Sequence, residues 1–158
     1  MKGFGYCVWW KIKNHPINLI VQRLSKTFNT PAFEPHISIR TKLPYIPVEF
    51  VYPEFKDVIT HQYKNMHTSS TYIYSWDAQF HAIEIPVAGP HLTYKSHVSV
   101  AYRLHQPFTE EELQLAERTV SEYHFTNILY NNLDVGVYDA SSIHPEEWFR
   151  ISKVYSAL

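Results

Sequence analysis

The sequence predicts an α+β fold in which β-strands pack against two amphipathic helices. Apolar and polar residues alternate along several segments, as they do in strands, and two other segments carry apolar residues at helical spacing. No linker or charge run divides the chain of 158 residues, 45% of which are hydrophobic and 18% charged. We therefore expect a single domain over residues 1–158, which is long enough to bury a hydrophobic core.

The first part of the chain predicts a strand, a helix and a second strand. Aromatic and β-branched residues dominate residues 4–12, in which Tyr6 and Trp9 face opposite sides of the strand. Residues 16–28 begin with a proline and carry apolar residues on one helical face, so they predict a helix. Residues 35–43 alternate again and are followed by a proline, which is typical of a strand and its end.

The middle of the chain is less regular. Residues 48–59 predict a strand interrupted by a proline, and the polar residues 60–70 predict an exposed loop. Strand character returns over residues 71–87, where a turn near Asp77 would divide the segment into a β-hairpin.

The last part of the chain mirrors the first in its order of elements. Residues 95–104 predict a strand, and residues 109–124 predict a helix with Thr109 as the N-cap of a capping box. Two more strands are expected over residues 132–139 and 147–157. The two halves thus share an internal symmetry of elements, strand–helix–strand in each, without any repeat of residues.

Composition limits the classes of partner and compartment. The formal charge of −1 provides no overall cationic field for long nucleic acid, but it is compatible with a small anionic ligand held by local groups. Cys7 is the only cysteine, so no intrachain disulfide can form. No apolar stretch approaches the roughly 20 residues that span a bilayer, and the N-terminal apolar run is too short for a signal peptide. We therefore expect a cytoplasmic protein without a membrane partner.

Two short motifs carry the chemical information of the sequence. Five histidines are followed two positions later by a serine or threonine, but only His36 and His97 start clearly alternating strands. Each of them shares its strand face with a serine, Ser38 and Ser99 respectively. Residues i and i+2 of a strand lie about 6.5–7 Å apart, so the imidazole and the hydroxyl can converge on one phosphate.

These residue types suit phosphoester cleavage without a metal ion or cofactor. A neutral imidazole accepts a proton from an attacking hydroxyl and a protonated one gives a proton to the leaving oxygen, and an unperturbed pKa near 6.5 allows both near neutral pH. Serine hydroxyls donate hydrogen bonds to the non-bridging oxygens of the transition state. Alternation places Arg40 and Arg103 on the same strand faces as the two motifs, and we expect them to offset phosphate charge.

Paired His-x-Ser strands in a chain of this size resemble the two-histidine (2H) phosphoesterase superfamily. The resemblance implies a fold of two αβ lobes related by a pseudo-two-fold axis, with the two motifs facing each other across a central cleft. It also implies that His36, Ser38, His97 and Ser99 are the catalytic residues. Both hydroxyl positions hold serine, where threonine is common in the superfamily.

Within the superfamily, the chain is most similar to phage enzymes that destroy the cyclic oligonucleotide signals of the bacterial CBASS defence. Its compact size, its lack of further domains and its 16% aromatic residues support this similarity. The similarity implies that the ribose 2′-OH attacks the adjacent 3′–5′ phosphodiester, in the cytoplasm of the host if the protein is phage-encoded. Bases would stack on aromatic side chains, for which Tyr6 and Trp76 are the candidates.

Other functions remain open at this point. An RNA or nucleotide 2′,3′-cyclic phosphodiesterase would use the same motifs, and a nucleotide-binding sponge would use the same residues without turnover. A virion or scaffold protein would need neither. The spacing of the histidines does not match a metal hydrolase, no GxSxG elbow indicates a serine hydrolase, and no GxxxxGK motif indicates a P-loop.

Overall fold

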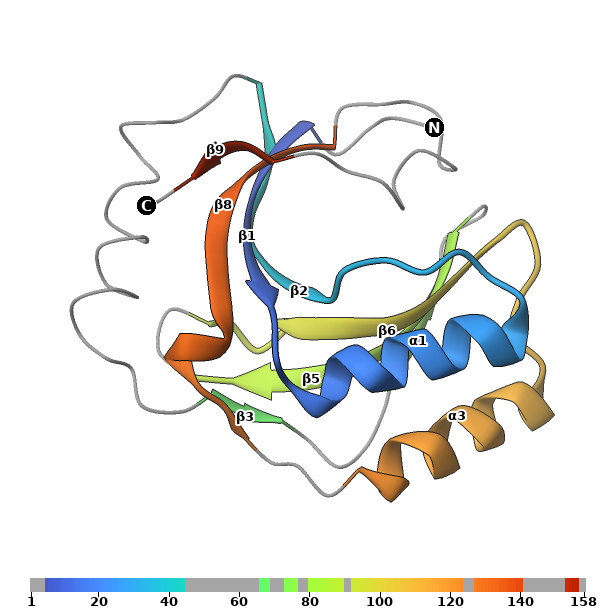
Figure 1. Ribbon diagram of the computed structural model, residues 1–158. Coiled ribbons are helices and arrows are strands. Elements are labelled where there is room, and N and C mark those ends of the chain that lie inside the picture. Colours follow the sequence, from blue (N-terminus) through green and yellow to red (C-terminus); the bar gives the residue numbers. More distant parts are fainter. Residues whose placement is uncertain are drawn as a thin grey trace.

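The structure is a computed structural model that describes residues 5–44, 66–68, 73–76, 80–89, 92–123, 127–140 and 153–156. These residues form an α+β fold, as predicted, in which strands of one antiparallel sheet pack against two helices (Figure 1). The elements are β1 (Gly5–Ile12), α1 (Pro16–Phe28), β2 (His36–Leu43), β3 (Met66–Thr68), β4 (Ile73–Trp76), β5 (Phe80–Ala88), β6 (His97–Leu104), α3 (Glu110–Glu122), β7 (Asn127–Ile128), a 3-10 turn (Tyr130–Asn132), β8 (Leu133–Ala140) and β9 (Lys153–Ser156).

Most predicted elements are confirmed. The first helix occupies residues 16–28, and α3 follows Thr109, whose side chain and that of Glu112 form the expected capping box. The hairpin predicted over residues 71–87 is present, since β4 and β5 pair in antiparallel fashion, although the turn near Asp77 lies outside the described residues. The strand expected over residues 48–59 also lies outside them.

One prediction in the middle of the chain is wrong. Residues 60–70 were expected to form a loop because they are polar, but Met66–Thr68 form strand β3. This strand pairs with β5 on one side and with β7 on the other. Its backbone hydrogen bonds therefore come from neighbours distant along the chain, which local polarity does not reveal.

The sheet has the strand order β7-β3-β5-β6-β2-β1-β8-β9, with β4 added beside β5. The two strands that begin with His36 and His97 are neighbours in the middle of this order. Each is flanked on its other side by one long antiparallel partner, β1 for β2 and β5 for β6. The strand order is therefore symmetric about the boundary between β2 and β6, with four strands of the order on each side.

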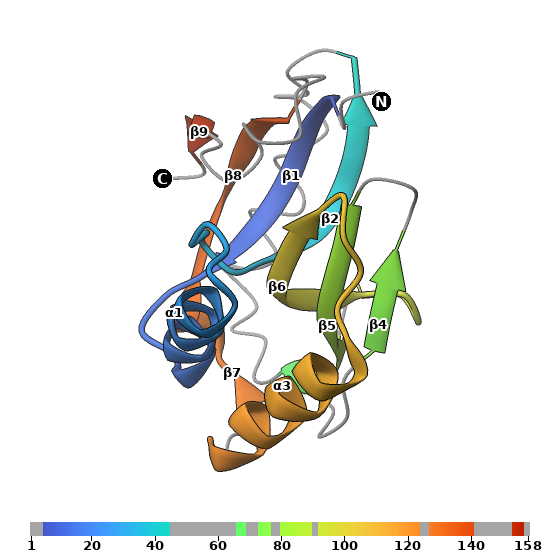
Figure 2. The same cartoon turned by 90° about the vertical axis from the view of Figure 1, so that its right-hand side faces the viewer.

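One face of the sheet carries the hydrophobic core. Alternate residues of the long strands point to this face, where they meet α1 and α3. Among the described residues, the strand residues of the core are Val8, Trp10, Ile12, Ile37, Ile83, Ile85, Val87, Val98, Val100, Ala101, Ile128, Val135 and Val137. Figure 2 shows α1 and α3 side by side on this side of the sheet, where Arg23 of α1 and Glu122 of α3 also form an ion pair.

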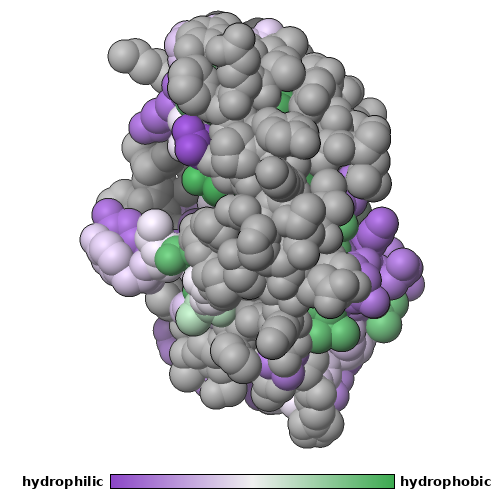
Figure 3. Space-filling view, turned by 90° about the vertical axis from the view of Figure 1, so that its left-hand side faces the viewer, coloured by the Kyte–Doolittle hydropathy of each residue, from purple (hydrophilic) through white to green (hydrophobic). Residues whose placement is uncertain are grey.

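The opposite face of the sheet has a different character. Alternation requires the remaining strand residues to point away from α1 and α3, and these include charged and polar side chains. On the molecular face drawn in Figure 3, the described residues form small separate hydrophobic and hydrophilic groups. Within the described residues, no helix is long and apolar enough to cross a membrane.

His15 begins helix α1 and ties it to a distant segment. Its Nδ1 accepts a hydrogen bond from the backbone N–H of Ile17 at 3.1 Å, and its Nε2 lies 2.7 Å from the carbonyl oxygen of Asn127. Since a carbonyl only accepts, the single ring proton of His15 is on Nε2. The side chain is buried, and burial lowers the pKa of His15, so the neutral form both caps the helix and bridges to β7.

We predict that His15 makes the stability of the fold depend on pH. At pH 7.5, His15→Ala should lower the free energy of unfolding by about 1 kcal/mol, the usual cost of a lost N-cap. The folded pKa is lowered from about 6.5, so the contribution is present above pH 6.5 and is lost as the pH falls through the folded value. Urea unfolding at several pH values measures the difference between the two proteins, which should shrink toward pH 5. A difference of equal size at both pH values would contradict this, and His15→Asn, which retains a capping oxygen, is the control.

Candidate functional site

The pairing of β2 with β6 brings the two predicted motifs together. Ile37 lies opposite Val98, and both are fully buried on the core face. One step in each direction along this antiparallel pair places His36 beside Ser99, and it places Ser38 beside His97. All four side chains therefore point away from the core, and we call them the histidine–serine cluster. The two histidines are diagonal neighbours, with backbone positions about 7–8 Å apart.

The two histidines make equivalent hydrogen bonds to the backbone. Nδ1 of His36 lies 2.9 Å from the carbonyl oxygen of Glu34, and Nδ1 of His97 lies 2.9 Å from that of Lys95. Each acceptor is two residues before its histidine. Because a carbonyl oxygen only accepts, both rings carry a proton on Nδ1. Nε2 of each histidine is therefore the nitrogen available for proton transfer.

His36 lies in an aromatic environment. Its ring stacks on Trp9, with the ring centroids 3.8 Å apart and the planes inclined by 20°, and Trp9 in turn stacks on Tyr138 at 5.0 Å. Burial is the largest cause that lowers the pKa of His36, to about 4, and the positive charges of Lys11 and His97 lower it further. The hydrogen bond to the carbonyl of Glu34 opposes the shift. His36 is consequently neutral at neutral pH.

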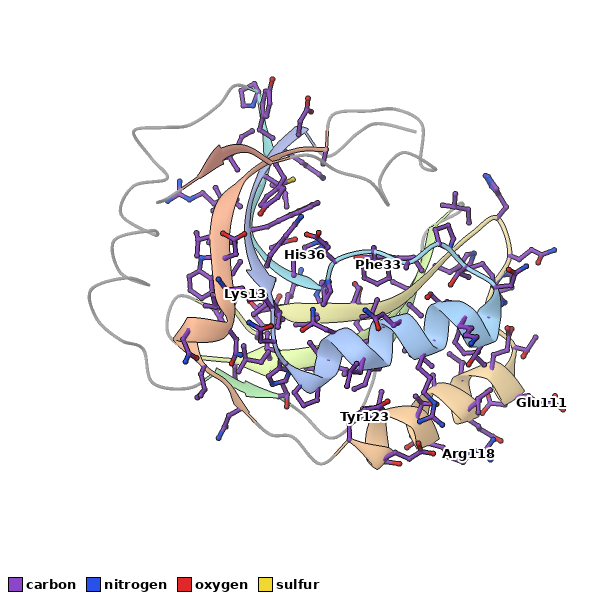
Figure 4. All side chains as sticks on the ribbon, viewed as in Figure 1. Lys13, Phe33, His36, Glu111, Arg118 and Tyr123 are labelled. Carbon is purple, nitrogen blue, oxygen red and sulfur yellow. The ribbon has the colours of Figure 1, made fainter. Side chains whose placement is uncertain are left out.

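His97 has a carboxylate neighbour instead. Its Nε2 lies 3.3 Å from Oε1 of Glu84, a side chain of the adjacent strand β5 that is 15% exposed. The His97 side chain is 39% exposed, so a ligand can still reach it. Figure 4 shows His36 at the start of β2, with α1 and α3 on the other side of the sheet.

The two serines of the cluster differ in their surroundings. Ser38 is exposed, whereas Ser99 is only 4% exposed and hydrogen-bonds to the side chain of Tyr102. Burial raises the pKa of Tyr102 to about 12, the hydrogen bond with Ser99 opposes the shift, and the charge of Glu84 adds to it. Phe33 covers Tyr102, with the ring centroids 4.4 Å apart, and lies in the segment before β2 (Figure 4).

A β-bulge in β6 explains why Tyr102 reaches the cluster. Ser99 lies opposite Glu84 but Ala101 lies opposite Ile83, so β6 contains one extra residue at Val100. The bulge reverses the alternation, and Ala101 joins the core while Tyr102 points to the same face as Ser99. The sequence pattern indicated regular alternation through this segment, which would have put Tyr102 on the core face.

The same bulge separates Arg103 from the cluster. Arg103 was expected on the face of His97, but its guanidinium bonds Glu112 of α3 with two nitrogens, one of them at 2.7 Å. Its Cζ also lies 4.6 Å from the ring centroid of Phe108 and 5.8 Å from that of Phe28. Arg103 thus joins β6 to both helices, on the side of the sheet opposite to the histidines.

The other expected binding residues have varied positions. Tyr6 is half-buried, lies opposite Leu43 and packs against the main core, so the structure does not bring it to the histidines. Arg40 was expected on the face of Ser38 and is exposed, but a register shift leaves one extra residue of β2 at Ile39. Arg40 therefore lies opposite Val8, a residue of the core face, and not on the face of the cluster. Trp76 is the last residue of β4, opposite His81, and its side chain lies outside the described part of the structure.

The sequence did not predict the neighbours of the cluster, among them Lys11, Trp9, Glu84 and Tyr102. Alternation on the first strand does place Trp9 and Lys11 together, and the structure shows that this is the face of His36. Strand pairing alone identifies Glu84, and the bulge alone identifies Tyr102. In the part of the chain that the structure describes, no three histidine, cysteine, aspartate or glutamate residues are grouped so that they can hold a metal ion.

Comparisons of the sequence with protein-family models and with curated proteins find no match. The histidine–serine cluster is therefore the feature of the molecule from which a function can be inferred. Chemically, the arrangement offers two Nε2 atoms on one face of the sheet, one exposed hydroxyl and one buried hydroxyl, next to a lysine and a glutamate. Such a set can bind a phosphodiester and move two protons.

We predict that nuclear magnetic resonance will find both imidazoles with the proton on Nδ1 when neutral, and that His36 will titrate near pH 4. Lys11→Met should raise the titration midpoint of His36, because the positive charge of Lys11 disfavours the imidazolium and Glu34 favours it. Long-range ¹H–¹⁵N spectra of ring-labelled protein measure both the tautomer and the midpoint. A midpoint of His36 near 6.5, unaffected by the loss of Lys11, would contradict the described environment.

Proposed function

We propose that the protein is a phosphodiesterase of the two-histidine (2H) type, which cleaves 3′–5′ phosphodiester bonds without a metal ion. One observation carries this proposal: the two His-x-Ser motifs lie on adjacent antiparallel strands, and both histidines donate Nδ1–H to a carbonyl two residues earlier. Two-fold equivalence of this kind suits the binding of one phosphodiester between two imidazoles. It also agrees with the resemblance of the motifs to the 2H superfamily.

The bilobal 2H fold is part of the same proposal. Strands β1 and β2 would form one lobe, and β5 and β6 with α3 the other, while α1, which packs against β6, would join the two. The symmetric strand order about the β2–β6 boundary supports this division. In this arrangement the pseudo-two-fold axis passes between Ile37 and Val98, and the cleft lies above the histidine–serine cluster.

In the proposed reaction, one neutral histidine removes the proton of the ribose 2′-OH, which attacks the adjacent phosphorus. The other histidine, protonated, gives its proton to the departing 5′-oxygen. The product ends in a 2′,3′-cyclic phosphate, which water then opens. Ser38, whose hydroxyl is exposed, is suited to donate a hydrogen bond to a non-bridging oxygen of the phosphate.

For the substrate we propose cyclic di- or oligonucleotides, the signals of the CBASS defence, so that a phage would use the enzyme against its host. The compact chain and its aromatic content support this choice. A panel of cyclic dinucleotides, cyclic trinucleotides and 2′,3′-cyclic mononucleotides, with analysis of the products, tests it. Turnover of the mononucleotides alone would favour the 2′,3′-cyclic phosphodiesterase, and binding without any turnover would favour the sponge.

We predict that His36→Ala and His97→Ala will each lower turnover by at least about 100-fold, the lower end of what a positioned proton-transfer group contributes. Single-turnover rates on the best substrate of the panel measure the effect, and circular dichroism verifies the fold of each variant. Nearly unchanged turnover in either folded variant would contradict the proposed chemistry. The profile of kcat/KM against pH should be bell-shaped, because one histidine must be neutral and the other protonated.

We also predict that EDTA will leave the activity of the wild-type protein unchanged. In the proposed reaction the histidines move the protons and the serine hydroxyls stabilise the phosphate, so no step uses a metal ion. Initial rates before and after dialysis against the chelator, and after addition of Mg²⁺ or Mn²⁺, measure this. Loss of activity that returns with one of these ions would contradict the mechanism.

A further inference from the structure

The two histidines are equivalent in their backbone hydrogen bonds but not in the charges around them. In the part of the chain that the structure describes, the charged groups that face His36 are Lys11 on β1, Glu34 in the preceding segment and His97 on β6. His97 is faced by Glu84 on β5 and by His36 on β2. On the long strand beside each histidine, the neighbouring charged side chain is thus Lys11 of β1 for His36 and Glu84 of β5 for His97.

Lys11 is held firmly beside His36. It lies directly opposite His36 in the pairing of β1 with β2, and its side chain is 16% exposed. Its Nζ forms an ion pair with Glu34 and lies 4.4 Å from the ring centroid of Tyr138. A lysine so restricted keeps its positive charge near His36 and disfavours a second positive charge on the imidazole.

Glu84 places a carboxylate beside Nε2 of His97. Nδ1 of His97 already donates to the carbonyl of Lys95, and a carboxylate only accepts, so a hydrogen bond from Nε2 to Glu84 requires a proton on Nε2 as well. That form is the imidazolium. At 3.3 Å the two atoms are slightly farther apart than in an ordinary N–H···O hydrogen bond, so the Nε2 proton remains available to another acceptor.

We infer that Lys11 and Glu84 give the two histidines fixed and different roles: His36 is the general base and His97 the general acid, and Glu84 is the positioning residue of the acid. This inference rests on the proposed phosphodiesterase function and adds to it the direction of proton transfer. The reverse assignment would put an imidazolium beside Lys11. It would also direct the lone pair of His97 Nε2 at the carboxylate of Glu84.

The first chemical step is then as follows. The proton of the 2′-OH moves to Nε2 of His36 while the 2′-oxygen forms a bond to phosphorus. The bond from phosphorus to the 5′-oxygen breaks, and its electron pair takes the proton from Nε2 of His97. The products are a 2′,3′-cyclic phosphate, a free 5′-hydroxyl, a protonated His36 and a neutral His97. In the second step a water oxygen forms a bond to phosphorus while His97 accepts its proton. The bond from phosphorus to the 2′-oxygen breaks, and His36 gives that oxygen its proton. The product is a 3′-phosphate, and both histidines are back in their starting forms.

A sulfur substitution distinguishes the two roles. The substrate of the panel that is cleaved fastest is compared with its analogue in which sulfur replaces the bridging 5′-oxygen. A thiolate, whose parent thiol has a pKa near 8.5, leaves without a proton, whereas an alkoxide does not. His97→Ala should therefore lower turnover of the oxygen substrate by at least about 100-fold and recover most of that turnover on the sulfur analogue. His36→Ala should be slow on both substrates.

Glu84→Gln tests the positioning residue, since it keeps the shape of the side chain and removes its charge. Turnover of the oxygen substrate by this variant should fall by about tenfold or more, as expected when the charged partner of an imidazolium is removed, and it should recover on the sulfur analogue. Glu117→Gln, an exposed carboxylate of α3 on the other side of the sheet, is the matched control and should match the wild type on both substrates.

The outcomes separate this inference from the proposed function. If the wild type cleaves the panel but sulfur rescues His36→Ala and not His97→Ala, the assignment of roles is overturned and the phosphodiesterase stands. If sulfur rescues neither histidine variant, the assignment of roles is overturned as well. If Glu84→Gln behaves like Glu117→Gln, Glu84 is not the positioning residue. If the wild type cleaves no member of the panel, the proposed function fails, and the inference fails with it.

Discussion

The pairing of β2 with β6 is the constraint on which the rest of the structure depends. Ile37 and Val98 lie opposite each other and are both fully buried against the helices. Because successive strand residues point to opposite faces, this burial forces the neighbouring histidines and serines to the other face. A slip of one residue would bury polar side chains and expose the apolar ones, so the hydrophobic core fixes the register of the cluster.

The bulge in β6 divides that strand into two parts with different tasks. Before the bulge, His97 and Ser99 belong to the candidate site. After it, Arg103 reaches α3, where it lowers the pKa of Glu112 to about 2 and so keeps that carboxylate charged. One extra residue at Val100 thus allows a single strand to serve the site at its start and the helix packing at its end.

Local patterns in the sequence predicted most of the elements, because both helices and the long strands show clear periodicity and recognisable caps. They also predicted that His36 shares a face with Ser38, and His97 with Ser99. The positions of Arg103 and Tyr102 could not be predicted, since a bulge depends on pairing with β5 and has no marker such as glycine at Val100. Likewise, Glu84 and Lys11 become neighbours of the cluster only through long-range pairing between strands.

The two histidines have equivalent backbone hydrogen bonds but neighbours of opposite charge, and this difference affects the proposed catalytic cycle. After the first step, the proton would lie on His36, beside Lys11, and His97 would be neutral beside Glu84. Both residues are then in the form that their neighbours disfavour. The second step returns both histidines to their starting protonation states. The electrostatic field of Lys11 and Glu84 would therefore oppose the proton transfers of the first step and favour those of the second. A pair of this kind is suited to opening the cyclic phosphate soon after it forms, rather than accumulating it.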